Sequence, residues 1–139
     1  MRVYSHSSLS TYQDCPLKYK LHYLDRVERP RETVEGFLGS RVHDALQKCY
    51  DDIRLTKLNT LEEIVAFYEA RWEREWTDDV AITRKDFKAE HYRSRGKRMV
   101  EAYYRRFAPF DADITIATEM RVGFSLDPVG KYRLTGFID

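Results

Sequence analysis

Residues 114–139 read ITIATEMRVGFSLDPVGKYRLTGFID, and this stretch decides the expected fold. Apolar and polar side chains alternate from Ile114 to Leu126 and again from Tyr132 to Ile138, which is the period of a β-strand. Between the two runs, residues 127–131 (DPVGK) are typical of a turn. The stretch therefore predicts an antiparallel β-hairpin whose second strand is still running at residue 139.

The apolar faces of this hairpin indicate its register. The two faces coincide only when paired residue numbers are both even or both odd. Pairing Leu126 with Tyr132 leaves a five-residue loop and puts Glu119 directly opposite Asp139. Their Cβ atoms would then be about 5 Å apart. A three-residue loop would make the two carboxylates diagonal neighbours on the same face instead.

Two carboxylates this close together repel each other, so one must bind a proton or a cation must lie between them. Mg²⁺ favours oxygen ligands of this kind. The alternative is a solvated polar face on which Arg121 and Arg133 neutralise Glu119 and Asp139, because charged side chains are mostly exposed. The hairpin by itself favours this second interpretation.

The residues before Pro109 repeat with a helical period instead. Helices are expected to begin at Ser7 or Ser8, at Pro16, near Gly39 and, with a Thr60–Glu63 capping box, after Thr60. A last helix is expected over residues 87–107, with residues 28–35 as a loop. Expected to be buried on these helices are Val42, Ala45, Leu46, Cys49, Leu61, Ile64, Val65, Tyr68, Trp72, Trp76, Tyr92, Met99, Val100, Tyr103 and Phe107, with Gly96 at a close helix crossing.

The chain is expected to be a single α/β (α+β) domain, helical over residues 1–110 and a hairpin over 111–139. A lone hairpin is marginal and its second strand would be a bare edge, so the sheet is expected to need strands from a downstream segment or a partner. With 42% hydrophobic and 34% charged residues, two cysteines, no secretory signal and no membrane-length apolar run, the composition favours a folded protein of the reducing cytoplasm. A net charge of +1 does not indicate a partner.

Four motifs now occur in the order found in RecB-like nuclease domains, which belong to the PD-(D/E)XK superfamily. Residues 8–23 (SLSTYQDCPLKYKLHY) resemble the opening helix pair of these domains. Residues 39–46 (GSRVHDAL) resemble their G-x-x-x-H-x-x-L helix, and residues 95–103 (RGKRMVEAY) the helix before the sheet. Glu119 followed by residues 136–139 (GFID) resembles their acidic strand and G-x-I-D motif. Each motif is weak alone, but the ordered set spans the chain.

The resemblance implies a restriction-endonuclease-like core and a metal-dependent DNA nuclease, most specifically an exonuclease of recombination or repair that works beside a helicase. It implies that His43, Glu119 and Asp139 are the catalytic metal ligands for Mg²⁺ or Mn²⁺. Ile138 stands where the name-giving proline would be. The family's (D/E)-x-K strand would come after Asp139, so this chain alone is expected to be inactive. A non-catalytic nucleic-acid-binding or scaffold module on the same fold is the alternative, and an ordinary helical interaction domain is a third.

Cys15 matches a position at which AddB-like relatives and some CRISPR-adaptation nucleases ligate a [4Fe–4S] cluster, together with three cysteines after the nuclease core. Three such cysteines would lie beyond residue 139, so packing is the first interpretation of Cys15 and the cluster the second. Basic side chains that could contact DNA phosphates are Lys18, Arg41, Arg95, Arg98 and Arg105, although a solvated helix face is the commoner explanation.

Overall fold

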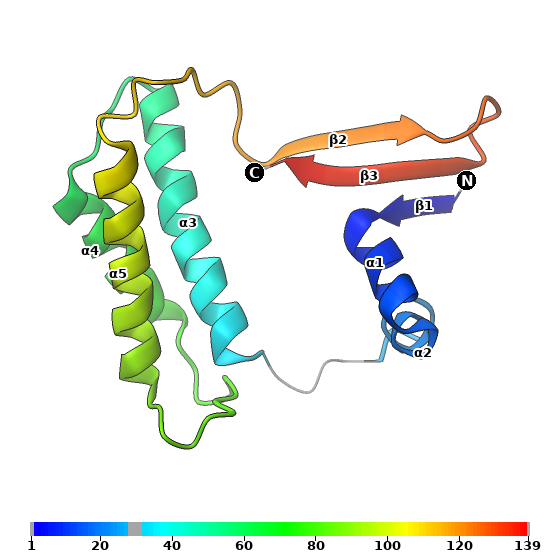
Figure 1. Ribbon diagram of the computed structural model, residues 1–139, viewed down its shortest axis with the longest axis horizontal. Helices are drawn as coiled ribbons and strands as arrows, with labels where there is room; N and C mark the ends of the chain where they lie inside the picture. Colours follow the sequence, from blue (N-terminus) through cyan, green and yellow to red (C-terminus); the bar gives the residue numbers. More distant parts are fainter. Residues whose placement is uncertain (1, 28–31, 139) are drawn as a thin grey trace. The chain divides into compact units, whose positions relative to one another are not determined.

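The computed structural model describes residues 2–27 and 32–138, so Asp139 and residues 28–31 of the expected loop lie outside the described residues. The chain forms two compact units. The sheet unit comprises Met1–Arg29 and Ala117–Asp139, and the helical unit comprises Pro30–Ile116. The predicted α/β class is confirmed, because helices accompany a mixed three-stranded sheet (Figure 1).

The helical unit contains α3 (Val34–Arg54), α4 (Leu61–Glu75) and α5 (Ala89–Phe107), which pack against one another in all three pairs. The predicted capping box at the start of α4 is confirmed. The Thr60 hydroxyl accepts from the Glu63 N–H at 3.2 Å, and the Glu63 carboxylate accepts from the Thr60 N–H at 2.8 Å. These reciprocal bonds satisfy two N–H groups that the first turn leaves without a helical partner.

Helix α3 begins at Val34, five residues before the predicted start near Gly39. The Thr33 hydroxyl caps it by accepting from the Gly36 N–H at 3.3 Å. A bridge to residue 81 holds this end, with the Val34 N–H donating to the Ala81 carbonyl at 3.0 Å. Residues 28–35 are mostly polar, so the sequence did not indicate the first turn of this helix. Its buried residues, Val34, Phe37 and Leu38, continue the buried stripe of α3 toward the N-terminus.

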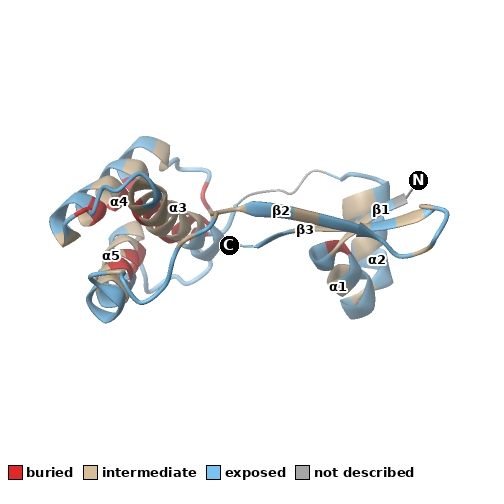
Figure 2. Cartoon of the chain, turned by 90° about the horizontal axis from the view of Figure 1, so that it is seen from above, coloured by how far each residue is buried: buried red, intermediate tan, exposed pale blue. Residues whose placement is uncertain are grey.

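Most of the core lies in the helical unit, where Figure 2 shows the buried residues gathered on α3, α4 and α5. An aromatic group organises it: the Phe37 ring meets Trp72 edge-on at 4.9 Å, and Trp72 stacks on Trp76 at 5.4 Å. The prediction that Met99 and Phe107 of α5 are buried is wrong. Met99 is 45% exposed and Phe107 is 43% exposed, because the side of α5 that packs inward carries Tyr92, Gly96 and Val100.

Gly96 marks the close helix crossing that the sequence predicted. A Cβ atom built on Gly96 would lie 2.1 Å from the Tyr68 hydroxyl oxygen, well inside van der Waals contact. That hydroxyl donates to the Arg93 carbonyl of α5 at 3.0 Å. A buried tyrosine therefore occupies the space that a side chain at residue 96 would need.

The sheet unit contains β1 (Arg2–Ser5), α1 (His6–Asp14), α2 (Pro16–Tyr19) and a π-helix over Lys20–Leu24, followed by β2 (Met120–Ser125) and β3 (Tyr132–Ile138). Its strand order is β1-β3-β2. Strand β1 pairs parallel with β3, and β2 pairs antiparallel with it. The prediction that β3 would be a bare edge is wrong over Tyr132–Thr135, because β1 from the chain's own first residues pairs with it there. That the sheet takes up further strands stays a prediction.

Helix α1 also begins earlier than predicted. Its N-cap is Ser5 rather than Ser7 or Ser8, and Ser8 takes the N3 position of a reciprocal capping box. The Ser8 N–H donates to the Ser5 hydroxyl at 3.1 Å, and the Ser5 N–H donates to the Ser8 hydroxyl at 2.9 Å. Ser5 thus ends β1 and starts α1, so the chain passes directly from strand to helix.

The hairpin register is the predicted one. Met120 pairs with Ile138 and Ser125 with Arg133, and the Leu126 N–H donates to the Tyr132 carbonyl at 2.9 Å, which leaves the five-residue loop. The first strand is shorter than predicted, since β2 starts at Met120 rather than Ile114. Glu119 has a φ of 51°, in the left-handed region, and this bend ends the extended backbone on its N-terminal side.

The hairpin loop is organised by the Asp127 carboxylate. It accepts from the N–H groups of Tyr132 at 2.7 Å, Lys131 at 3.0 Å and Val129 at 3.1 Å. The Tyr132 and Lys131 bonds, in that order, hold the pKa of Asp127 below its ordinary value. The loop is thus tied to an ionised side chain.

We expect the loop to loosen in acid. Because the pKa of Asp127 is lowered on folding, its stabilising bonds are fully present above the unfolded value of 3.8 and are lost as pH falls through the lower folded value. NMR amide shifts of Val129, Lys131 and Tyr132 should follow that lower pKa, and Asp127→Asn should abolish the transition. Unchanged amide shifts between neutral pH and about pH 2 would contradict this account.

No helix within the described parts of the chain combines the length and apolarity needed to cross a membrane.

Candidate functional site

Glu119 lies at the residue before β2, where its left-handed backbone turns the incoming chain into the strand. Non-glycine residues are uncommon in this conformation, and such outliers cluster at functional sites. The side chain is half-buried. Since the register runs to Met120–Ile138, Glu119 immediately precedes the last described pair of the hairpin.

The polar face of the sheet carries a hollow of about 390 Å³, lined by Val3, Arg121, Val122, Gly123, Arg133 and Thr135. Gly123 keeps it open on one side, because a Cβ there would lie 3.3 Å from both the Nε and an Nη atom of Arg133. The Arg133 guanidinium therefore lies over the Gly123 backbone. Arg121 in β2 and Arg133 in β3 both have odd numbers, so the strand alternation places these two cations on the same face of the sheet. Glu119 precedes β2 and has a left-handed backbone, so the alternation does not extend to it.

His43 lies on α3 of the helical unit, beside the buried stripe formed by Val42, Ala45 and Cys49. Its side chain is half-buried. Leu46 was predicted to belong to the buried stripe, and it is partly buried against the core. Helix α3 thus holds His43 on a rigid element at the margin of the hydrophobic core.

The three predicted metal ligands are distributed along the chain. Glu119 belongs to the sheet unit, His43 belongs to the helical unit, and Asp139 lies outside the described residues. Within residues 2–27 and 32–138, no group of three or more His, Cys, Asp or Glu side chains is placed to hold a metal ion. In donor chemistry the predicted set fits a divalent cation, since two carboxylates and one imidazole are ligands that such ions accept.

The two cysteines have different surroundings. Cys49 is buried in the core as predicted, and burial raises the pKa of its thiol to about 11, with the Asp52 carboxylate adding to the effect. Cys15 is half-buried and caps α2, its sulfur accepting from the Lys18 N–H at 3.5 Å. Cys15 therefore has a local structural role at the start of a short helix.

The tyrosines around Cys15 form a row in the sheet unit. Tyr12 meets Tyr19 edge-on at 5.4 Å, and Tyr19 stacks on Tyr23 at 5.1 Å. They line a hollow of about 830 Å³ together with Val3, Tyr4, Leu9 and Leu24. Tyr12 is 54% exposed, so this row is only partly packed among the described residues.

The basic residues of α5 divide into two sets. Arg93 is held by α4, pairing with Glu69 and, at 2.6 Å, with Glu73, while Lys97 lies 3.9 Å from Glu69. Arg95 and Arg98 are exposed and form no salt bridge with any residue that the structure describes. The helix thus uses some of its cations for packing and leaves others on its outer side.

The remaining predicted phosphate contacts also differ from one another. Arg41 is 14% exposed and pairs with Glu75 and, at 3.3 Å, with Asp44, so its guanidinium belongs to a network within the helical unit. Arg105 is 69% exposed and lies 3.9 Å from Glu101. Lys18 is exposed on α2. Of these three, Arg41 is the least suited to an external phosphate.

Sequence reasoning missed Arg84 and treated Arg121 and Arg133 only as neutralising charges. Arg84 precedes α5, and with Arg95 and Arg98 it lines a pocket of the helical unit. The available signal was the excess of positive charge over residues 84–98, which contain seven Lys or Arg residues but only two Asp or Glu residues. Which of those cations are unpaired depends on contacts with α4 that no sequence pattern displays.

Comparison with known proteins bears on this site. A family model described as the PD-(D/E)XK nuclease superfamily matches residues 3–139. No curated protein and no solved structure gave a match. The matched segment covers nearly the whole chain, including both strands of the hairpin, Glu119, His43 and the G-x-I-D sequence. The chain therefore belongs to the PD-(D/E)XK nuclease superfamily.

Proposed function

We propose that the protein is a divalent-metal-dependent deoxyribonuclease whose metal ligands are Glu119, Asp139 and His43. The observation that carries the proposal is the hairpin register. The sequence predicts that Glu119 faces Asp139 in this register. The described strands keep the register from the Ser125–Arg133 pair to the Met120–Ile138 pair. The left-handed backbone at Glu119 supports the proposal, because strained positions of this kind cluster at functional sites.

The residue types suit phosphodiester hydrolysis. A bound divalent cation supplies charge neutralisation at the scissile phosphate and lowers the pKa of water. The Glu119 and Asp139 carboxylates would hold that cation, and the His43 imidazole would complete the ligand set. Arg121 and Arg133, on the polar face of the sheet, would attract and orient the phosphates of the bound DNA strand, because guanidinium groups match phosphate geometry.

The resemblance to RecB-like domains extends the proposal to exonuclease action in DNA recombination or repair, in the cytoplasm and beside a helicase. Mg²⁺ or Mn²⁺ is the proposed ion. A [4Fe–4S] cluster at Cys15 would require three further cysteines, since Cys49 lies in the core of the helical unit. We therefore assign Cys15 first to capping α2 and second to a cluster.

The proposal predicts strict metal dependence. We expect the complete natural protein to degrade labelled DNA with Mg²⁺ or Mn²⁺, to stop when EDTA removes the ion, and to recover when the ion is restored. Gel analysis of end-labelled single- and double-stranded DNA measures the rate and shows whether cleavage starts at an end. Cleavage that persists unchanged in EDTA would overturn the proposed mechanism.

The alternative is a non-catalytic nucleic-acid-binding module on the same fold. It is favoured by Arg84, Arg95 and Arg98 of the helical unit, which form no salt bridge within the described ranges and need no metal to bind DNA. DNA binding without cleavage in either metal would support this alternative against the nuclease. Absence of both binding and cleavage would exclude both functions.

A further inference from the structure

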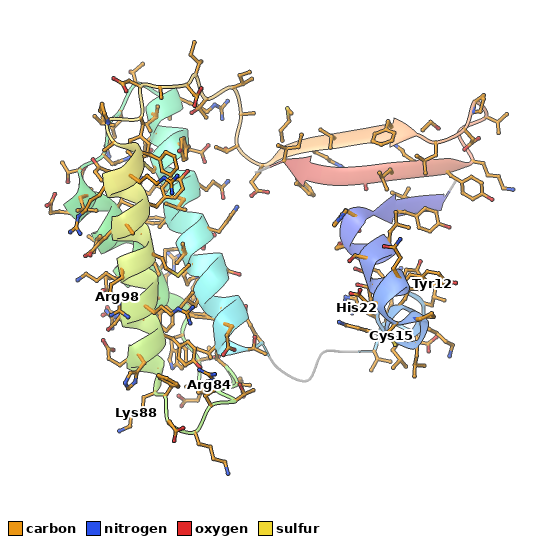
Figure 3. All side chains as sticks on the ribbon, viewed as in Figure 1. Tyr12, Cys15, His22, Arg84, Lys88 and Arg98 are labelled. Atoms are coloured by element: carbon orange, nitrogen blue, oxygen red, sulfur yellow. The ribbon has the colours of Figure 1, made fainter. Side chains whose placement is uncertain are left out.

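A small basic pocket lies entirely within the helical unit. Its volume is about 130 Å³, and its walls are Arg84, Phe87, His91, Tyr92, Arg95 and Arg98. Arg84 belongs to the loop before α5, and Arg98 lies on α5 itself (Figure 3). The residues at 91, 95 and 98 are spaced by one helical turn, so their side chains follow one side of α5.

Three of the residues that line this pocket, Phe87, His91 and Tyr92, carry aromatic rings. The Phe87 ring meets His91 edge-on at 5.4 Å and Tyr92 at 6.1 Å. The Arg84 guanidinium lies 5.6 Å from the centre of the Phe87 ring, a cation–π arrangement that positions it at the pocket. The Phe87 ring, itself packed on His91 and Tyr92, thus supports the Arg84 guanidinium.

Three arginines of the pocket are without a salt-bridge partner among the residues that the structure describes. Arg84, Arg95 and Arg98 form no salt bridge with any residue in the described ranges, whereas Arg93 on the same helix is neutralised by two glutamates of α4. One lining residue contacts a carboxylate, since the Tyr92 hydroxyl donates to Glu35 at 3.2 Å. Three guanidinium groups gathered around one cavity therefore favour an anion.

His91 adds a hydrogen-bond donor. Its Nδ1 accepts from the Lys88 N–H at 3.2 Å. A neutral imidazole with an accepting Nδ1 carries its proton on Nε2. The ring can therefore donate through Nε2 without first binding another proton.

The chemistry and the size of the pocket favour a phosphate group as its ligand. Planar guanidinium forks match the tetrahedral oxygens of a phosphate. The pocket is far smaller than the roughly 300–1,000 Å³ of sites that enclose a whole small molecule. It fits one charged group of a larger ligand, and a nucleic-acid strand presents such groups at each step.

We propose that this pocket binds one backbone phosphate of a nucleic-acid strand, held jointly by Arg84, Arg95 and Arg98. The assignment rests on the proposed function only for the class of ligand. It places a substrate contact on the helical unit, made without any of the proposed metal ligands. Such a contact would fix the strand independently of the metal.

The test measures binding without metal. Fluorescence anisotropy of a labelled single-stranded oligonucleotide, in EDTA, gives Kd for the purified protein and its variants at several salt concentrations. We expect Arg98→Ala to raise Kd about five- to tenfold and to lower the salt slope by no more than about 0.7, the value for one single-strand phosphate. Circular dichroism should be unchanged, because Arg84, Arg95 and Arg98 are exposed.

Arg106→Ala is the matched control, since it removes the same charge from the same helix at an exposed position that does not line the pocket. It should change Kd less than about twofold. An equal loss of binding in Arg106→Ala and Arg98→Ala would overturn the pocket and indicate a diffuse basic face.

Two further outcomes are decisive. The triple variant Arg84→Ala/Arg95→Ala/Arg98→Ala should lose the same slope of about 0.7, and a loss of about 2 would mean three separate phosphates rather than one. Polyglutamate that competes as well as unlabelled DNA would indicate an acidic protein partner and overturn the assignment. Cleavage with Mg²⁺ is a separate readout, so failure of the pocket leaves the nuclease proposal standing.

Discussion

Replacing Asp139 by asparagine should lower the rate of metal-dependent DNA cleavage by about a thousandfold or more. Asparagine keeps the size of the side chain and removes its negative charge. A carboxylate ligand holds a cation that stabilises the transition state by several kcal/mol, and about 4 kcal/mol corresponds to a factor of a thousand. The loss should persist at saturating metal, because the missing charge affects the transition state as well as ion affinity.

Glu119→Gln tests the second carboxylate of the proposed metal site. We expect the rate to fall about ten- to a hundredfold, less than for Asp139, because Glu119 matches an acidic residue near the metal site rather than the signature acid itself. Initial rates in Mn²⁺, with calorimetric titration of the ion, separate lost affinity from lost catalysis.

Asp111→Asn is the matched control for both carboxylates. Asp111 is exposed in the connection between α5 and β2, so its variant should cleave DNA at the normal rate. Wild-type rates in Asp139→Asn at ordinary Mg²⁺ would remove Asp139 from the proposed site. A reduced rate in Asp111→Asn would show that the assay responds to any lost negative charge.

Gly96→Ala should destabilise the helical unit by about 1–5 kcal/mol. Alanine is the better helix former by about 1 kcal/mol, but its Cβ would lie 2.1 Å from the Tyr68 hydroxyl oxygen. Overpacking costs about 1–3 kcal/mol, and displacing Tyr68 breaks its bond to the Arg93 carbonyl for about 1–3 kcal/mol more. The steric cost therefore exceeds the gain in helix propensity.

Urea unfolding followed by tryptophan fluorescence measures this effect in the correct unit, because both tryptophans of the chain, Trp72 and Trp76, lie in α4 or at its C-cap. The double variant Gly96→Ala/Tyr68→Phe should recover part of the loss, since phenylalanine lacks the oxygen nearest to the new methyl group. Additive effects of the two substitutions would argue against contact between residues 68 and 96.

Gly39→Ala provides the opposite control. Gly39 also lies within a helix, and in the described structure nothing comes within 4 Å of a Cβ built there. Its replacement should stabilise the helical unit by about 0.5–1 kcal/mol, because alanine restricts the unfolded chain more than glycine does. Destabilisation of similar size by both substitutions would contradict the structural account of Gly96.

The hairpin register could be predicted from the sequence because it is a local property. Residues 120–138 carry their own alternation and their own turn, so matching faces and a short loop leave few possible pairings. The Thr60–Glu63 capping box could be predicted for the same reason, since its two partners are three residues apart in the sequence. The left-handed backbone at Glu119 gave no such signal, and it shortened the strand.

The interactions that the sequence did not predict join distant residues. Strand β1 pairs with β3 across about 130 positions, Val3 with Arg133 and Ser5 with Thr135, and no local pattern indicates which edge a four-residue strand will fill. The start of α3 is similar, because the bridge from Thr33 to Ala81 lies outside any helical period.

The sequence by itself determined the α/β class, the hairpin register and the order of motifs that matches the nuclease superfamily, because all three are properties of short stretches of chain. The tertiary structure alone decided which cations remain available for a ligand. Arg93 and Arg95 are two residues apart on one helix, yet α4 supplies Glu69 and Glu73 to the first and no carboxylate among the described residues pairs with the second. Charge neutralisation depends on what lies across the interface, and packing sets that.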